Sequence, residues 1–166
     1  MEGRDGGVEP PKRRMAAGAV FLDDEGRILI VKPTYRAEWL VPGGVVEQHE
    51  SPRAACLREV REELGLETEA GRLLCVEYES ADESHSEGLK FIFFGGVLSA
   101  AQVQAIGIDR SEIEEFRLVP PDEAMARLDV RLARRLTLAL RALAQDRTVY
   151  AEDGAELTPD TTMRQR

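Results

Sequence analysis

Three glutamates, Glu59, Glu62 and Glu63, lie close together in the segment LREVREELG, and Glu50 precedes them. Residues three and four apart share one side of an α-helix, so a helix here presents three carboxylates on one arc. These like charges repel each other, and a bound cation offsets the repulsion. Hard divalent ions prefer carboxylate oxygen, and Mg²⁺ is commonly held by a few carboxylates together with substrate phosphates. The spacing therefore indicates a metal site for phosphate chemistry, with a solvated acidic surface as the alternative.

The helix that carries these glutamates is predicted by the residues at its two ends. Ser51 can accept a hydrogen bond in the first turn, and Pro52 fits the first helical position, where a missing N–H costs nothing. Gly65 suits the left-handed residue that ends a helix. These signals predict one helix from Ser51 to Leu64, with its apolar stripe packed and its acidic arc facing a cleft.

The complete spacing pattern resembles the signature of the Nudix hydrolases, G-x5-E-x7-R-E-U-x-E-E-x-G-U, where U is apolar. Its positions are filled without a gap by Gly44, Glu50, Arg58, Glu59, Val60, Glu62, Glu63, Gly65 and Leu66. Since seven positions demand one residue type, a chance match at a given start is on the order of 10⁻⁸. The resemblance implies an α/β fold, an α/β/α sandwich in which helices flank a mixed β-sheet, and metal-dependent hydrolysis of a diphosphate.

The resemblance also implies roles for single residues. It makes Glu59, Glu62 and Glu63 ligands of Mg²⁺, with Mn²⁺ as a second candidate ion. It adds the main-chain carbonyl of Gly43 as a further ligand. Arg58 is expected to orient a glutamate of the helix, and the alternative for Arg58 is a surface ion pair with Glu62.

Two acidic residues outside the helix have open roles. Glu50 precedes the helix N-terminus, where the helix dipole favours negative charge, so it either supports the loop or contacts metal or substrate. Some Nudix enzymes activate water with a glutamate of the helix, here Glu59, and others with one on a distant loop. Glu112 is the candidate for that distant base and for an extra metal ligand, with Glu114 and Glu115 as competitors and plain surface charge as the alternative.

Substrate recognition is expected from Arg36 and Trp39, with Glu50 as a third candidate. The stretch YRAEWLVPGG resembles the W-x-x-P-G-G segment of MutT-like members. Trp39 either stacks on a base or packs in the core, and Arg36 either reaches phosphates or is solvated. The proline and the tyrosine that mark some ADP-ribose and dinucleoside polyphosphate hydrolases beyond the signature are absent, and Asp82, Glu83 and Ser84 occupy that region. This favours a nucleoside triphosphate or another nucleotide derivative, with ADP-ribose or a sugar nucleotide as the alternative.

Composition limits the class of protein. A length of 166 residues and a hydrophobic content of 43% suit one domain with a packed core. The net charge of −9 argues against a nucleic-acid polymer as partner, because such binding needs Lys and Arg to neutralise phosphates. A small nucleotide substrate is compatible with this charge when a metal supplies the positive charge.

The cysteines and the apolar runs indicate the compartment. Cys56 and Cys75 show neither a disulfide framework nor C-x2-C metal spacing, so we expect free thiols in a reducing compartment. No apolar run reaches the roughly 18 residues that span a bilayer, and no apolar signal segment follows the first charges. We therefore expect a cytoplasmic protein that makes no membrane contact.

The remaining pattern predicts the elements around the acidic helix. Strands are predicted at 16–22, 27–32, 73–79 and 90–98, and helices at 121–128 and 132–143. Strands, a helix, further strands and terminal helices suit a mixed sheet covered on both faces. Residues 1–14 are predicted to be a disordered N-terminal tail and 147–166 a polar C-terminal tail, which leaves 15–146 as the Nudix domain.

Three function classes compete. The first is a Nudix pyrophosphohydrolase. The second is a catalytically weak nucleotide-binding regulator that kept the fold. The third is an isomerase of the isopentenyl diphosphate type, which needs a catalytic cysteine, and neither Cys56 nor Cys75 sits in a matching motif. Because dimers are common in the family, the resemblance also predicts a homodimer.

Overall fold

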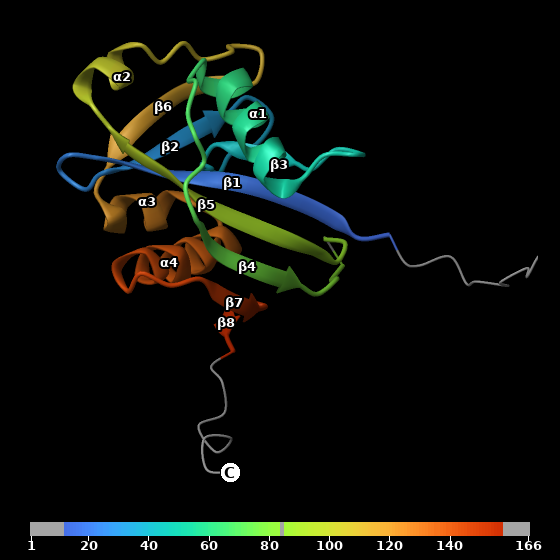
Figure 1. Cartoon of the computed structure of the whole chain (residues 1–166). Helices are drawn as coiled ribbons and strands as arrows, with labels where there is room; N and C mark the ends of the chain where they lie inside the picture. The colour runs from blue at the N-terminus through green and yellow to red at the C-terminus, as the bar shows by residue number, and fades with distance from the viewer. Residues whose placement is uncertain (1–11, 84, 158–166) are drawn as a thin grey trace, which may run out of the picture.

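The computed structural model describes residues 12–83 and 85–157, which form one mixed β-sheet with helices on both faces (Figure 1). The strands are β1 (Arg14–Asp23), β2 (Ile28–Pro33), β3 (Gly43–Val45), β4 (Leu73–Glu79), β5 (Gly88–Leu98), β6 (Ile113–Val119), β7 (Val149–Glu152) and β8 (Ala155–Glu156). The helices are α1 (Pro52–Leu64), α2 (Ala100–Gln104), α3 (Pro121–Arg127) and α4 (Val130–Ala144). The predicted α/β sandwich is confirmed.

The sheet order is β6-β2-β1-β5-β4-β7-β8, and the short strand β3 pairs with β1 outside this path. Strand β1 runs parallel to β5 and antiparallel to β2 and β3, which makes the sheet mixed. The turn between β1 and β2 is stabilised by Asp23, whose carboxylate accepts hydrogen bonds from the N–H groups of Glu25 and Arg27. Strand β1 thus pairs with β2 near this turn and, closer to its other end, with β3, which contains Gly43 and Gly44.

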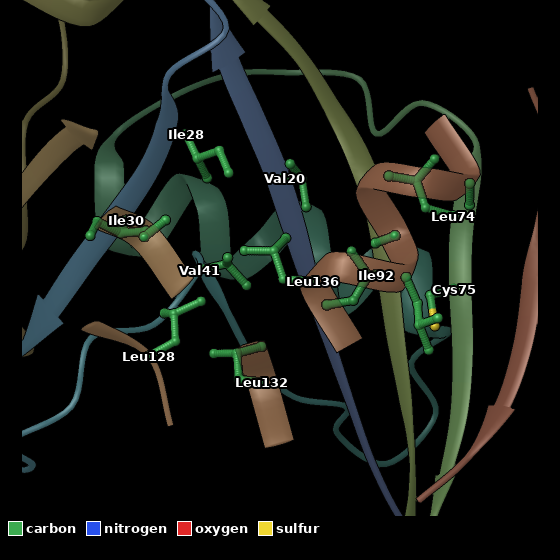
Figure 2. Close-up of a cluster of buried hydrophobic side chains, with 14 of the residues drawn as sticks. Val20, Ile28, Ile30, Val41, Leu74, Cys75, Ile92, Leu128, Leu132 and Leu136 are labelled. Carbon is green, nitrogen blue, oxygen red and sulfur yellow. The ribbon is translucent and has the colours of Figure 1, made fainter. Parts of the chain in front are cut away.

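The two faces of the sheet bury separate hydrophobic clusters. Side chains of a strand alternate between faces: in β2, Ile28 and Ile30 point to the side of α3 and α4, whereas Leu29 and Val31 point to the side of α1. Figure 2 shows the first cluster, in which Leu132 and Leu136 of α4 pack against the strands. The helix that carries the glutamates therefore covers one face, and the terminal helix covers the other (Figure 1).

The C-terminal segment corrects one expectation. The chain was expected to become a polar tail at residue 147, yet β7 pairs in parallel with β4 and β8 completes a small hairpin at this edge. Val149 and Ala151 are buried, while Tyr150 and Glu152 are exposed, so this short strand alternates. Residues 158–166 of the predicted tail lie outside the described residues, as do residues 1–11 of the predicted N-terminal tail. The domain begins slightly earlier than expected, because β1 starts at Arg14.

The longest helix in residues 12–83 and 85–157 has 15 residues, and none is long and apolar enough to cross a bilayer.

Candidate active site

The helix α1 has the ends that the sequence predicts. The Ser51 hydroxyl accepts a hydrogen bond from the Ala54 N–H at 3.1 Å, Pro52 opens the first turn, and Gly65 ends the helix at a φ of +64°. These local contacts fix where α1 starts and stops. The buried residues Val60 and Leu64 pack on the sheet and set which side of α1 faces the Gly43–Gly44 loop.

The three glutamates of α1 differ strongly in exposure. The Glu62 side chain is 51% exposed and the Glu59 side chain 15%, whereas Glu63 is 4% exposed. The expectation that all three face a cleft opposite the packed stripe is therefore wrong for Glu63. Glu63 is buried because the Gly43–Gly44 loop packs against it, and the Gly43 N–H donates to its carboxylate.

The Gly43–Gly44 loop lies directly against two of these carboxylates. The Gly43 N–H donates to an Oε of Glu63 at 2.9 Å. A Cβ on Gly44 would lie 2.3 Å from Oε1 of Glu59, and a Cβ on Gly43 would lie 2.3 Å from the Ala17 carbonyl oxygen. Gly43 also has a φ of +145°, which side chains rarely allow. Gly43 is therefore required for the loop to approach β1 so closely, whereas a side chain at Gly44 would displace the Glu59 carboxylate.

Arg58 connects the remaining acidic groups. Its guanidinium donates to Glu59 at 2.8 Å, to Glu62 at 2.9 Å, and to both oxygens of Glu50 at 2.9 and 3.0 Å. It also reaches the Val45 carbonyl at 3.1 Å. The pair with Glu62 that was the alternative role is present, but it is one bond among several. Arg58 thus holds the loop and the helix in one arrangement.

Glu50 supports this arrangement and does not line the cleft. Both of its oxygens bind Arg58, and one also accepts from the Glu47 N–H at 3.1 Å. The hydrogen bonds from Arg58 and from this N–H lower the pKa of Glu50. These contacts fit the loop-supporting alternative instead of the role in substrate binding.

Burial and like charge raise the pKa values of two glutamates. Burial first, and then the charges of Glu59, Glu112 and Glu62, raise the pKa of Glu63 to about 8, although the Gly43 N–H acts in the opposite direction. Burial, with the charges of Glu62 and Glu112, also raises the pKa of Glu59, against the opposing effect of Arg58. A divalent cation at these oxygens would offset the repulsion.

The donor set fits a hard divalent ion. Among the described residues, no three His, Cys, Asp or Glu side chains converge on a common point as they lie. The physical reason is that Arg58 holds Glu59 and Glu62, while the Gly43 N–H holds Glu63. Carboxylate oxygens nevertheless are the ligands that Mg²⁺ and Mn²⁺ prefer, and a cation favours the charged form of the carboxylates around it.

The raised pKa of Glu63 predicts a pH-dependent stability of the metal-free protein. Between the ordinary value of 4.5 and about 8, the folded protein holds a proton on Glu63 that the unfolded chain has lost. The free energy of unfolding therefore falls as pH rises through this window. Thermal unfolding in EDTA from pH 5 to 8.5 should show this decline, and Glu63→Gln should flatten it. An identical slope in both proteins would contradict the assignment.

The structure brings Glu112 to the same side of the molecule as Glu59 and Glu63. Glu112 is exposed in the turn before β6, and its carbonyl accepts from the Thr34 N–H at 2.8 Å. Its charge contributes to the raised pKa of both helix glutamates. Of its competitors, Glu115 pairs with Arg117 on β6 at 3.1 Å.

A cleft of about 200 Å³ opens beside the Gly43–Gly44 loop, between β1, β5 and α4. Its walls include Arg36, which was predicted to bind substrate, and several polar residues that were not predicted to lie in the site. The cations among its lining residues are Arg36, Lys90, Arg131 and Arg135.

Each of these four cations has a carboxylate partner. The pairs are Arg36 with Glu38 and Asp129, Lys90 with Glu79, Arg131 with Asp82, and Arg135 with Glu77 and Glu79. Glu77, Glu79 and Arg135 are buried, where opposite charges must satisfy each other. The cleft therefore offers hydrogen-bonding groups of nearly balanced charge instead of a strongly positive surface.

Sequence reasoning missed Arg131 and Arg135, although a signal was present. The two arginines are four residues apart on α4, so they share one side of this helix. Arg135 also lies three residues after Leu132 and is therefore on the side of α4 that packs on the sheet. A charged residue inside an apolar stripe usually marks a buried partner or a site.

Trp39 lies in the core instead of in the cleft. It is 7% exposed and belongs to the cluster beneath α4. The guanidinium groups of Arg117 and Arg127 lie over its ring, with centroid distances of 5.2 and 5.4 Å. Its ring is thus already covered by cation–π contacts, so the base-stacking role is corrected in favour of the core alternative.

The cysteines are unsuited to nucleophilic chemistry. Cys56 and Cys75 are free and buried, as expected. Burial raises the pKa of the Cys56 thiol to about 12 and that of Cys75 to about 11. Because the thiolate is the reactive form, neither supports the cysteine-dependent isomerase alternative.

Comparison with known proteins agrees with this geometry. The family model of the NUDIX domain matches residues 12–140. A MutT-like protein of Streptomyces ambofaciens is 29% identical over 154 residues, which cover 92% of each chain. Diphosphoinositol polyphosphate phosphohydrolase 2 of Rattus norvegicus is 40% identical over 75 residues, which are 45% of this chain and only 41% of that relative. A crystal structure of a UDP-X diphosphatase shares the fold with a TM-score of 0.68 and 22% identity, covering 87% of this chain and 69% of that one.

Proposed function

The chain belongs to the Nudix hydrolase family, whose members act on pyrophosphate bonds, and we propose that it is a Mg²⁺-dependent hydrolase of a nucleotide in which a nucleoside diphosphate is linked to another group. A nucleoside triphosphate is the first substrate class, and ADP-ribose or a sugar nucleotide is the alternative. The observation that carries the proposal is the meeting of Glu59 and Glu63 at the Gly43–Gly44 loop, beside the cleft.

Each group of this site has a proposed task. Glu59, Glu62, Glu63 and the Gly43 carbonyl would hold the ion, which when bound supplies positive charge to phosphate oxygens. Arg58 donates hydrogen bonds to both Glu59 and Glu62, and its positive charge reduces the repulsion between these two carboxylates.

Proton transfer and substrate orientation are assigned to residues outside α1. Glu112 accepts the proton of the attacking water, because a carboxylate tied to a cation is a poor base. Arg36 lies in the cleft and orients the substrate there. This assignment gives binding, positioning and proton transfer to different residues.

A second candidate substrate is a diphosphoinositol polyphosphate, which the name of the partly matched relative suggests. Such a substrate carries phosphates all around its ring and needs several unpaired cations. In the cleft described above, Arg36, Lys90, Arg131 and Arg135 all have carboxylate partners. Pulling Arg135 away would deprive two buried carboxylates, Glu77 and Glu79, of their shared partner, and the other cations are already paired. The balanced cleft therefore favours an uncharged organic group such as a nucleoside.

Glu112→Gln tests the assignment of the base. The substitution should lower kcat by roughly 10² to 10⁴-fold while Mg²⁺ affinity stays nearly unchanged, because it removes the proton acceptor alone. The control is Glu67→Gln, which removes one charge from an exposed residue that has no proposed role in catalysis. Should Glu112→Gln behave like wild type, the base must come from α1, with Glu59 as the first candidate, or from Glu114 or Glu115. Loss of the acidic limb of the pH profile of kcat would mark the variant that removed the base.

The function is tested by a substrate panel with product identification by mass spectrometry. The panel contains nucleoside triphosphates, ADP-ribose, sugar nucleotides, NADH, CoA, diadenosine polyphosphates and a diphosphoinositol polyphosphate, each with Mg²⁺, Mn²⁺ or excess EDTA. We expect cleavage between phosphates of a nucleotide substrate with metal and none with EDTA. Full activity in EDTA would overturn the metal assignment. Nucleotide binding without any turnover would favour the regulator alternative.

The predicted homodimer and the cytoplasmic location stay predictions. A sedimentation measurement of the full chain would establish the first.

A further inference from the structure

Tyr35 is an exposed aromatic residue close to the candidate active site. Its side chain is 72% exposed. The loop that carries it lies between Glu112 and the cleft. The loop spans residues 32–39 and is closed at its base by two hydrogen bonds between Val31 and Leu40, at 2.8 and 2.9 Å.

The backbone on either side of Tyr35 is held in place. The Thr34 N–H donates to the Glu112 carbonyl at 2.8 Å, and the Thr34 hydroxyl donates to the Ser111 carbonyl at 3.1 Å. On the other side, the Lys32 ammonium donates to the Arg36 carbonyl at 2.6 Å. A ring presented by such a fixed loop loses little conformational entropy when it binds a partner.

These contacts place Tyr35 between the proposed base and the cleft. Thr34, the preceding residue, is bonded to Glu112, and Arg36, the following residue, lines the cleft. Partial burial of its hydroxyl, followed by the charge of Glu63, raises the pKa of Tyr35, so this hydroxyl lies within the field of the acidic cluster. The ring is therefore close to the place where the phosphates of a substrate would lie.

We propose that the ring of Tyr35 stacks on the base of the nucleotide substrate, a role that rests on the proposed function. Base stacking on aromatic side chains tolerates many bases, because every base has a π-face. The other aromatic candidate, Trp39, is buried and covered by Arg117 and Arg127. Tyr35 thereby supplies the preference for nucleotides over base-free diphosphates.

The test compares two cleavage-resistant probes that differ only in the nucleoside. Calorimetry with Mg²⁺ measures binding of α,β-methylene-ADP and of methylenediphosphonate to wild type, Tyr35→Ala and Tyr35→Phe. We expect Tyr35→Ala to weaken binding of the nucleotide analogue by about tenfold or more, the scale of one base stack, and to leave methylenediphosphonate unchanged. Tyr35→Phe should bind both probes like wild type. The matched control is Tyr150→Ala, which removes an exposed tyrosine from β7.

Several results would overturn the proposal. These are equal binding of the nucleotide analogue by wild type and Tyr35→Ala, equal weakening of both probes, and no binding of the analogue by wild type. The substrate panel remains a separate measurement of the proposed function. A protein that hydrolyses nucleotides but is indifferent to Tyr35→Ala contradicts the stacking role alone, whereas a protein that binds the analogue through Tyr35 without turnover contradicts the hydrolase.

Discussion

Glu63→Gln is expected to lower kcat by at least 100-fold, which corresponds to about 2.7 kcal/mol in the barrier. The substitution keeps the shape of the side chain, and its amide oxygen can still accept from the Gly43 N–H. What it removes is the charge that a divalent ion and the substrate phosphates require. The measurement is kcat at saturating Mg²⁺, together with a thermal unfolding curve that shows an intact fold.

The control for Glu63→Gln is Glu67→Gln, which removes one charge from an exposed residue just beyond α1. This variant should retain the wild-type rate. If Glu63→Gln also retains that rate at saturating metal, Glu63 is a buried structural carboxyl and not a ligand.

Arg58→Ala is expected to have the second large effect, on both rate and stability. The guanidinium donates to Glu50, Glu59 and Glu62, so its loss leaves three carboxylates without their cation. We expect kcat to fall by at least about 100-fold and the free energy of unfolding to fall by about 3 kcal/mol, as when one partner of a largely buried pair is removed. Arg58→Lys should recover only part of either loss, because an ammonium cannot reproduce the planar fork.

Arg61→Ala provides the comparison for Arg58→Ala, since Arg61 is exposed on the same helix. Denaturant unfolding and steady-state kinetics of the two variants separate the effects of helix propensity and net charge from the contacts of Arg58. Similar behaviour of the two alanine variants would contradict the role of Arg58 in arranging the site.

The elements that were predicted correctly are those with strong local signals. The helix α1 has a serine cap, an N-terminal proline and a terminal glycine, each of which acts within one turn. The strands β1 and β5 are long apolar runs. By contrast, β3 consists of two glycines and a valine, and it forms only because it pairs with Ala17 and Gly18 of β1. The strand β7 likewise depends on its distant partner β4.

In the candidate site too, the features set by local geometry were predictable from the sequence, and those set by distant segments were not. The spacing of Glu59, Glu62 and Glu63 predicted a shared arc, because helix geometry is local. The burial of Glu63 was not predictable, since it depends on the approach of Gly43 from another segment. The covered ring of Trp39 is also a non-local effect, because the arginines over it belong to β6 and α3.

We propose that the carboxylates at the Gly43–Gly44 loop form a divalent-metal site. Electron paramagnetic resonance of Mn²⁺ measures this binding directly, without any choice of substrate. We expect wild type and Glu67→Gln to bind Mn²⁺ with equal affinity, and Glu63→Gln to lose at least about tenfold, or roughly 1.4 kcal/mol of binding free energy. Equal Mn²⁺ affinity in wild type and Glu63→Gln, or no Mn²⁺ binding by wild type, would contradict the account.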